Sequence, residues 1–392
     1  MKIENILIEH FPRLKCANFF ILFDTNFDDV SSVRVHLRPT EIFVRFENDH
    51  STTIDLQSLA VRIQINSLSL LIAKENLISF RINIASSFRE EILPMQSTMN
   101  AASAMKRLSL NVEPDTEFSI VCDNCSGPLS KSLHFRRILE LPSEQMDSNE
   151  WFCHKPEATT CNGQHQPVFS ATSLMPAEDD LLFGNYFALI HRTHIQNIHV
   201  NSQQRMIHCK RCLSHIGESV GDSTLKFWNG NIKIIRTNVD TPERLFTDSN
   251  SLFHNFLVIV DRVSYDYQML GRQTLKLLFE ARSSKGTTFL FIQTMARNLE
   301  IYQMDKHTNT TTDRATMTRV DGIKCLFLCE ENTDRTLVEF WQKDVNVVSA
   351  HISIGMLDAT VEHLHLLSKY VPEQFRMNNG FCLSYLSYGI NS

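Results

Sequence analysis

The sequence predicts an α+β protein with an N-terminal antiparallel β domain, a central β-rich region and a C-terminal α+β region. Apolar and polar residues alternate near the N-terminus, paired cysteines mark the middle, and helical and extended patterns follow one another after it. The 392 residues are 43% hydrophobic and 21% charged, which excludes a largely disordered chain. A chain of this length buries a core without covalent cross-links, so its ten cysteines need another explanation.

The N-terminus and the charge balance predict a soluble intracellular protein. The first residues contain Glu4, Glu9 and His10 and no small-residue cleavage site, so they do not form a secretory signal. No apolar run reaches the ~18–20 residues of a membrane span. The formal charge of −6 gives no general attraction to nucleic acid. We expect a cytoplasmic and nuclear protein with reduced thiols and no membrane partner.

Residues 1–115 are predicted to form an antiparallel β scaffold domain. Val33, Val35 and Leu37 alternate with polar residues, and so do Val61 and Ile63. This period of two is typical of a sheet with one solvated face. We see no catalytic signature in this region and interpret it as a scaffold.

Residues 226–392 are predicted to form an α+β region. The segment 356–370 places Leu357, Val361 and Leu364 on one side, as in an amphipathic helix. Similar patterns predict two more helices, over 242–263 and 336–343. Strands are predicted over 225–235, 273–282, 287–294, 299–304, 323–329 and 381–388.

The central region, residues 116–225, contains two Cys-x-x-Cys units, Cys122-Asp-Asn-Cys125 and Cys209-Lys-Arg-Cys212. Two residues between thiols allow both sulfurs of a tight turn to bind one ion, and two such turns complete a tetrahedral thiolate site. Zinc suits this ligand set best. We therefore expect one structural, four-cysteine zinc site that staples the region together. Unrelated buried or redox cysteines are the alternative.

A long polar loop, 142–180, separates these two units, and a loop of this length is functional or disordered. It carries a second cluster of thiol and imidazole groups: Cys153, His154, Cys161 and His165. One interpretation is a second local zinc site. Another is a thiol that the loop presents to a partner, and a third is a packed loop anchored by Trp151 and Phe152.

The remaining cysteines read mainly as core residues. Cys16, Cys325 and Cys382 lie in apolar segments. Cys329 precedes a polar run and is expected near a strand end, where a thiol is accessible. None of the four has a base next to it in the sequence, so a nucleophile here has little local support.

Several short motifs follow one another along the chain in a specific order. They are Leu141-Pro142-Ser143-Glu144, Trp151-x-Cys153-His154, Gly184-x-x-Phe187, Cys209-Lys210-Arg211-Cys212, Gly217-Glu218 and, before the last strand, Arg376-Met377-Asn378. In this order they resemble the HECT-like ubiquitin-protein ligases that bind ubiquitin-conjugating enzymes. The resemblance covers most of residues 116–392 and, more loosely, the N-terminal β region.

The resemblance implies ubiquitin transfer as a first activity. The HECT-like region, 226–392, would accept ubiquitin from a conjugating enzyme as a thioester and pass it to a substrate lysine. HECT domains carry a Thr-Cys pair near the C-terminus, and Cys382 lacks the preceding Thr. Cys329 is therefore the candidate catalytic residue.

The resemblance also implies that the protein binds and blocks the zinc-dependent endonuclease of pre-mRNA 3′-end cleavage and polyadenylation. The matching residues are Cys153 and His154, which would contact the zinc of the partner. A loop thiolate is a good ligand for an open zinc position and would displace the nucleophilic water there.

Three functions follow from these observations. The first is a ubiquitin ligase that also inhibits the endonuclease, with a conjugating enzyme, ubiquitin and the endonuclease subunit as partners. The second is an inhibitor or chaperone of the endonuclease without ligase activity. The third is a zinc-ribbon nucleic-acid binder, suggested by Lys210 and Arg211. Two cations without interleaved aromatic residues do not form a basic stripe, so nucleic acid is the weakest of these partners.

Overall fold

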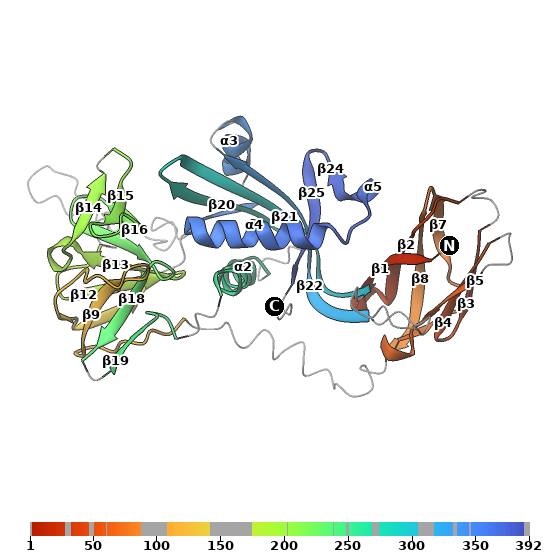
Figure 1. Cartoon of the computed structure of the whole chain (residues 1–392), viewed down its shortest axis with the longest axis horizontal. Helices are drawn as coiled ribbons and strands as arrows, with labels where there is room; N and C mark the ends of the chain where they lie inside the picture. Colours follow the sequence, from red (N-terminus) through yellow and green to blue (C-terminus); the bar gives the residue numbers. More distant parts are fainter. Residues whose placement is uncertain are drawn as a thin grey trace, which may run out of the picture.

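The computed structural model describes residues 2–27, 33–46, 51–59, 61–87, 108–141, 175–201, 203–237, 239–247, 251–268, 274–304, 317–331, 335–344 and 346–387. Over these residues the chain is mostly β-sheet. Three parts lie in a row: the N-terminal strands at one end, the cysteine-bearing strands at the other, and the C-terminal helices and strands between them (Figure 1). None of the helices in these ranges is long and apolar enough to cross a membrane.

An eleven-stranded sheet joins the N-terminal and C-terminal parts. Strand β1 (Ile3–Phe11) pairs antiparallel with β2 (Cys16–Phe23) on one side and with β21 (Gly286–Met304) on the other. The first strand of the chain therefore lies inside the sheet. The path of the sheet continues outward from these strands through β22 (Met317–Glu331), β25 (Phe381–Ser387) and β24 (Met377–Asn378) on one side, and β8 (Leu77–Ser87) and β6 (Val61–Ile63) on the other.

A small sheet covers the N-terminal end of this large one. It consists of β3 (Arg34–Arg38), β4 (Glu41–Arg45) and β5 (Ser51–Asp55). Ile42 and Val44 of β4 pack with Phe19 and Phe80 of the large sheet in one hydrophobic core. The alternation that predicted strands here is confirmed, because Val35 and Leu37 are the less exposed residues of β3 and Val61 and Ile63 are the buried residues of β6. Strand β7 (Ser69–Lys74) pairs with β8 and exposes most of its residues.

The buried residue Glu9 ties β1 to the end of the chain. Its side chain is fully buried, and Lys324 of β22 lies 2.7 Å from it. The Tyr385 hydroxyl of β25 donates to the same carboxylate at 2.6 Å, and Asn18 of β2 donates at 3.1 Å. A buried charge needs such partners, and here they come from three strands of the same sheet, β2, β22 and β25.

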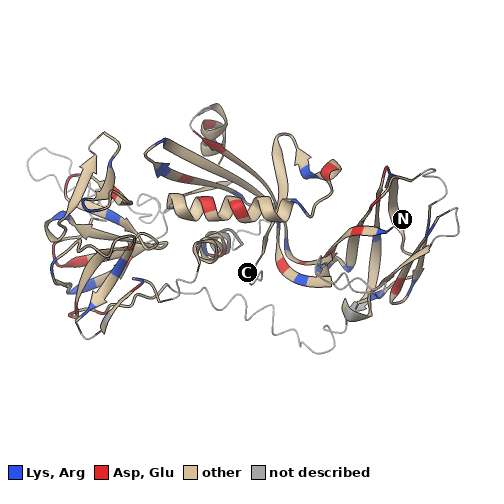
Figure 2. Ribbon diagram, viewed as in Figure 1, with Lys and Arg blue, Asp and Glu red and all other residues tan. Residues whose placement is uncertain are grey.

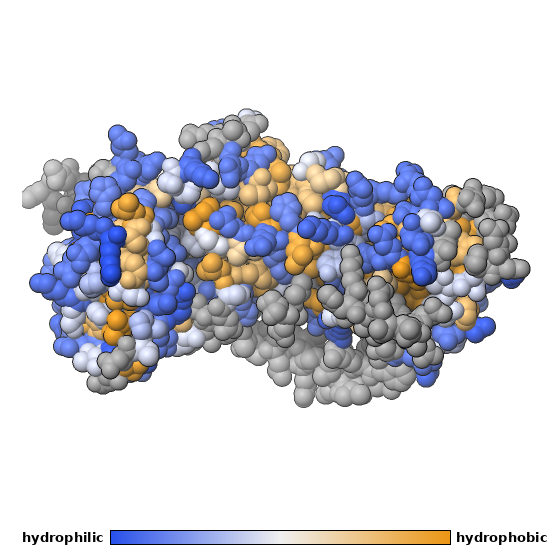
Figure 3. All heavy atoms as spheres, in the orientation of Figure 1, coloured by the Kyte–Doolittle hydropathy of each residue, from blue (hydrophilic) through white to orange (hydrophobic). Residues whose placement is uncertain are grey.

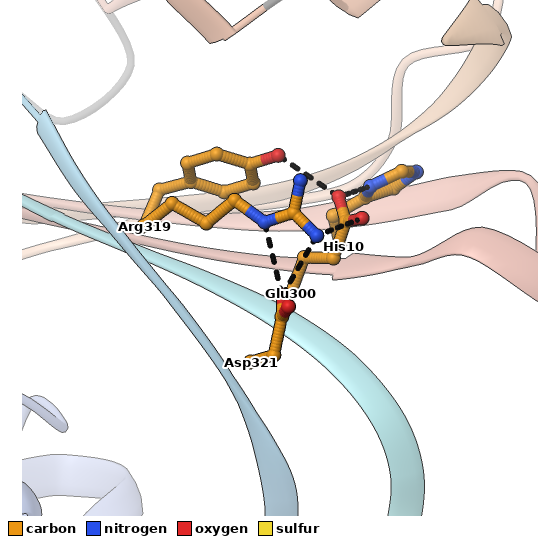
Figure 4. A network of polar contacts seen from close by, with 5 residues as sticks. His10, Glu300, Arg319 and Asp321 are labelled. Atoms are coloured by element: carbon orange, nitrogen blue, oxygen red, sulfur yellow. Dashed lines mark hydrogen bonds and ion pairs between the residues drawn. The ribbon is translucent and has the colours of Figure 1, made fainter. Parts of the chain in front are cut away.

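The next residue, His10, lies in a second polar network (Figure 4). Its Nδ1 atom lies 2.8 Å from Glu300 of β21. The Tyr302 hydroxyl donates to the same carboxylate at 2.9 Å. Arg319 of β22 contacts Glu300 at 2.7 Å and Asp321 at 2.8 Å. Glu9 and His10, two of the residues that argued against a signal sequence, thus contact strands from the C-terminal part of the chain.

The cysteine-bearing part consists of two sheets that pack around one core. Phe118 and Ile120 of the first sheet and Ile207 and Phe227 of the second belong to that core. The first sheet has the order β10 (Leu133–His134), β9 (Glu117–Cys122), β18 (Ile232–Arg236) and β19 (Val239–Glu243). The second has the order β11 (Arg137–Glu140), β12 (Asp180–Gly184), β13 (Phe187–His191), β17 (Thr224–Trp228), β16 (His215–Val220), β15 (Met206–Cys209) and β14 (Ile198–Asn201).

Helices cover both faces of the C-terminal part of the large sheet. Leu277 and Phe279 of β20 (Lys276–Ser283) face the core that α2 (Leu252–Gln268) and α4 (Ile354–Ser368) complete. Leu278 faces the other side, where α3 (Arg335–Lys343) contributes Val338 and Trp341. Strand β23 (Val347–His351) pairs parallel with β20, and α5 (Glu373–Arg376) precedes β24. Hydrophobic residues appear among polar ones over this middle part (Figure 3).

The α+β description fits only loosely, because strands dominate all three parts. The helix predicted over 242–263 begins only at Leu252, since residues 239–243 form β19. The strand predicted over 225–235 is two strands joined by a turn in which Asn231 N donates to Trp228 O at 2.9 Å. The strands predicted over 287–294 and 299–304 are one strand, β21, with register shifts between Thr294 and Leu299. The division at residues 115 and 225 stays a prediction; β18, beyond 225, pairs with β9.

Candidate metal centre

The first Cys-x-x-Cys unit forms a tight turn at the end of β9. Cys122 O accepts a hydrogen bond from Ser126 N at 2.9 Å, and Cys122 N donates to Gly127 O at 2.9 Å. Asp123, inside the turn, contacts Lys233 of β18 at 2.9 Å and Arg244 at 3.2 Å. These contacts fix the turn to the neighbouring strand.

The second unit repeats the same pattern at the end of β15. Cys209 O accepts from Leu213 N at 2.9 Å, and Cys209 N donates to Ser214 O at 2.9 Å. Leu213 has a φ of 60° and Ser126, its counterpart in the first turn, a φ of 53°. The two turns thus share a backbone conformation that side chains rarely adopt. Similar backbone turns place their sulfurs in similar positions.

The four cysteine sulfurs of the two turns form one cluster. They all lie within 4.8 Å of one another. The contacts Cys122 Sγ–Cys212 Sγ and Cys125 Sγ–Cys209 Sγ both measure 3.7 Å, and each joins one sulfur of each turn. A tetrahedral ion with bonds of ~2.3 Å to sulfur separates its ligands by ~3.8 Å, whereas a disulfide requires ~2.05 Å. The spacing therefore suits four separate thiolates around one ion.

The four cysteines differ in burial. Cys122 and Cys209 are buried, and Cys125 and Cys212 are half-buried. A Cβ atom on Gly127 would lie 3.2 Å from Cys125 Sγ and 3.2 Å from the Arg211 side chain. Glycine therefore allows the first turn to approach the second. A set of four thiolate ligands is typical of a structural site.

Hydrogen bonds around the cluster favour the thiolate form of Cys212. Ser214 Oγ accepts from Asn124 Nδ2 at 2.8 Å and lies 3.3 Å from Cys212 Sγ. Hydrogen bonds with Ser214 lower the pKa of the Cys212 thiol to about 6. Burial raises the pKa of Cys122 to about 12. A bound cation would offset that effect and favour all four thiolates.

The residues predicted to contact the zinc of a partner, Cys153 and His154, lie outside the residues that the structure describes. The same holds for Cys161 and His165. The strands on either side of that segment, β11 and β12, pair in parallel. Arg137 donates two hydrogen bonds to Asp180, at 2.7 and 2.6 Å, and so clamps the two strands together.

Cys329 lies near the end of β22 and is half-buried. Burial, together with the negative charges of Glu331, Asp358 and Glu330, raises the pKa of this thiol to about 11. Its assignment as a catalytic residue stays a prediction. The prediction that Cys16 and Cys325 belong to the core is confirmed, because both are buried. Cys382 is half-buried.

Residues 9–383 match the sequence model of a protein family described as HECT-like ubiquitin-conjugating enzyme (E2)-binding. The chain belongs to this family. The match begins in β1 and ends in β25, so this HECT-like E2-binding family includes the N-terminal strands as well as the cysteine-bearing part and the C-terminal region.

Relatives in other organisms carry related names. An E3 ubiquitin-protein ligase of Rattus norvegicus is 30% identical over 112 residues, which are 28% of this chain and 27% of the rat protein. The Homo sapiens protein of the same name is 25% identical over 310 residues, which are 68% of this chain and 71% of the human protein. An uncharacterized protein of Saccharomyces cerevisiae is 23% identical over 127 residues, covering 31% of this chain and 35% of that protein. No solved structure matches the chain.

Sequence reasoning for this HECT-like chain missed the polar residues that support the cluster. Asn124 lies inside the first turn and Ser214 directly after the second, and together they reach Cys212. Their positions in the sequence, within or directly after a Cys-x-x-Cys unit, could have identified them, since polar residues beside a metal-binding turn often hydrogen-bond to its ligands. Figure 2 shows Lys and Arg interspersed with Asp and Glu on these strands, without a continuous basic stripe on this face.

Proposed function

We propose that this HECT-like protein recruits a ubiquitin-conjugating enzyme and works with it in ubiquitin ligation. The family match over residues 9–383 carries the proposal. The large sheet supports it, because β1 and β21 make the N-terminal scaffold and the HECT-like region one hydrogen-bonded body. Isothermal titration calorimetry should show that the full chain binds a conjugating enzyme, either free or loaded with ubiquitin. No binding to any member of a panel of conjugating enzymes would contradict the proposal.

The four-cysteine cluster is proposed to hold one structural zinc ion. The 3.7 Å sulfur contacts, the thiolate ligands and the burial all fit this ion. Zinc would neutralise the thiolates and tie β9 to β15, which are about 90 residues apart, since Cys122 and Cys212 differ by 90 positions. The ion therefore contributes folding free energy to the cysteine-bearing part.

Acceptance of ubiquitin on Cys329 is the finer part of the ligase proposal. A thioester forms from the thiolate, and a pKa of about 11 leaves about one thiolate in 10⁴ at neutral pH. The conjugating enzyme would have to bring positive charge to this acidic surface for the transfer to proceed. The alternative is that ubiquitin passes from the conjugating enzyme directly to the substrate.

A single experiment separates these two routes. A conjugating enzyme loaded with labelled ubiquitin is mixed with the wild-type chain, Cys329→Ala and Cys382→Ala. A reductant-sensitive adduct that only Cys329→Ala abolishes supports transfer through Cys329. An adduct that both variants retain contradicts it, and substrate ubiquitination without any adduct supports direct transfer.

Inhibition of the zinc-dependent endonuclease of pre-mRNA 3′-end processing is a second proposed function. It relies on Cys153 and His154, whose thiol and imidazole groups are suitable ligands for an open zinc position. The Arg137–Asp180 clamp supports it, because it holds the described strands on both sides of that segment. Cys153→Ala should weaken the complex with the endonuclease and leave the melting temperature unchanged. A large loss of stability would instead identify Cys153 as an internal structural ligand.

A further inference from the structure

A groove of about 610 Å³ lies between the cysteine-bearing part and the C-terminal sheet. One wall is the turn between β14 and β15, at residues 203–205. The other is the side of β20, β21 and β22 that α3 covers, with Phe289 and Val338 as apolar lining. This volume is in the range of ligand-binding sites. Neither the cysteine motifs nor the proposed ligase and inhibitor roles account for it.

Carboxylates dominate the charged lining of the groove. Glu280, Glu330 and Glu339 line it, together with Arg205 and Arg282. Arg282 already has two acidic neighbours: its Nε atom lies 3.0 Å from Glu280, and its Nη1 atom lies 3.9 Å from Glu218. The positive charge of Arg282 is therefore already neutralised by carboxylates of the protein itself.

Glu330 stands out because one of its carboxylate oxygens has no partner. Its Oε2 atom is buried, and no described residue hydrogen-bonds to it. Glu330 is opposite Phe289 in the β21–β22 pair, and Cys329 is opposite Leu290. Successive side chains of a strand point to opposite faces, so Glu330 faces the groove while Cys329 faces α4. A buried carboxylate oxygen without a donor costs free energy that an incoming donor would recover.

We propose that this groove binds an extended peptide segment of a partner protein and takes one of its arginine or lysine side chains against Glu330. The aliphatic part of such a side chain would pack on Phe289 and Val338. Its cationic head would pair with the Glu330 carboxylate, which lines the groove, and Glu339 would add a second negative charge. A charge-assisted hydrogen bond of this kind is among the strongest available to a peptide. The inference does not depend on thioester formation or on the zinc-dependent endonuclease.

Fluorescence anisotropy with the full chain tests the groove. The probe is a fluorescein-labelled Gly-Gly-Arg-Gly-Gly peptide, and the matched probe has citrulline, a neutral isostere, in place of arginine. The arginine peptide should bind saturably, and at least about tenfold more tightly than the citrulline peptide. Glu330→Gln should remove this preference. Glu331→Gln is the matched control, because it removes the same charge one residue further along, from the exposed opposite face of β22, and should leave the preference intact.

The melting temperature gives an independent check. If Glu330 has no internal partner, Glu330→Gln should unfold at the same temperature as the wild type or a higher one. A lower melting temperature would show that Glu330 has an internal partner and would overturn the proposal. Equal affinity for the two peptides would also overturn it, and so would wild-type affinity in Glu330→Gln. Tighter binding of a Gly-Gly-Glu-Gly-Gly peptide would overturn it as well, because it would assign the groove to anions held by Arg205.

Discussion

At the scale of single residues, the sulfurs of the four-cysteine cluster matter most. They come from two turns with the same hydrogen bonds, and their 3.7 Å contacts suit a tetrahedral ion. The spacing of the cysteines in the sequence was sufficient to predict this cluster, because each turn is local. Asn124 and Ser214 were not predicted, because their contacts depend on how one turn faces the other.

Loss of one ligand should remove the metal. Cys209→Ser is expected to lower the zinc content from one ion per chain to near zero and to destabilise the protein by about 4 kcal/mol or more, because the loss of a structural metal is among the largest effects of a single substitution. Mass spectrometry of the metal and thermal unfolding measure the two effects. Cys382→Ser is the control and should retain the ion. A wild-type chain purified without any metal, yet stable to chelators, would contradict the assignment.

Glu300 makes stability depend on pH. Burial alone would raise its pKa, but hydrogen bonds with His10 and Tyr302 and the charge of Arg319 outweigh burial and lower it. A carboxyl whose pKa is lower in the folded state stabilises the protein above its unfolded pKa, and this stabilisation disappears as the pH falls through the folded value. The free energy of unfolding of the wild type should therefore exceed that of Glu300→Gln at neutral pH, and this difference should shrink as the pH falls below the unfolded pKa of about 4.3 and through the lower folded value. Unfolding curves at a series of pH values measure this, and a constant difference would argue against it.

At the scale of elements, β1 is the strand that connects the two ends of the chain. Its neighbours β2 and β21 were both predicted to be extended, but no local pattern shows that a strand from residues 286–304 returns to pair with residues 7–10. Nor does any local pattern show that β21 is continuous, because the two strands predicted over 287–294 and 299–304 are joined by a segment with register shifts. Local periodicity thus identifies strands better than it identifies their partners.

The Glu9 carboxylate should make Lys324 indispensable. Lys324→Met leaves a fully buried charge without its cation and should cost about 3–5 kcal/mol. The double variant Glu9→Gln, Lys324→Met removes both charges and should recover part of that loss. Urea unfolding of the wild type, both single variants and the double variant measures the coupling. Additive effects would mean that the two charges do not depend on each other.

Helix α4 depends on Ser353, the N-cap residue that precedes it. Ser353 Oγ accepts a hydrogen bond from Met356 N at 3.2 Å and caps the helix. Ser353→Ala should destabilise the protein by about 1 kcal/mol. Ser353→Asp retains an acceptor at this position and should keep most of the stability. Equal loss in both variants would indicate that packing of the buried Ser353, rather than capping, is responsible.

At the scale of the whole molecule, the N-terminal and C-terminal parts share one sheet. The chain after residue 226 should therefore fail to fold alone, because β21 would lose its partner β1 and the Glu9 and His10 contacts. Expression of residues 226–392 alone, with and without residues 1–115 supplied as a separate chain, measures this by solubility and cooperative unfolding. Cooperative unfolding of 226–392 by itself would show that this part folds independently and would contradict the expectation.

The position of β1 also determines when the protein can fold during synthesis. His10 and Glu300 are 290 residues apart, and Glu9 and Tyr385 are 376 apart. At ~5–20 residues per second, a ribosome needs roughly 15–60 s to produce the strand that pairs with β1. During that delay β2 protects one edge of β1 and the other edge stays open to wrong partners. The polar side chains of Glu9 and His10 should disfavour aggregation of β1 during this time. In the folded protein the same side chains form hydrogen bonds and ion pairs with strands of the C-terminal part.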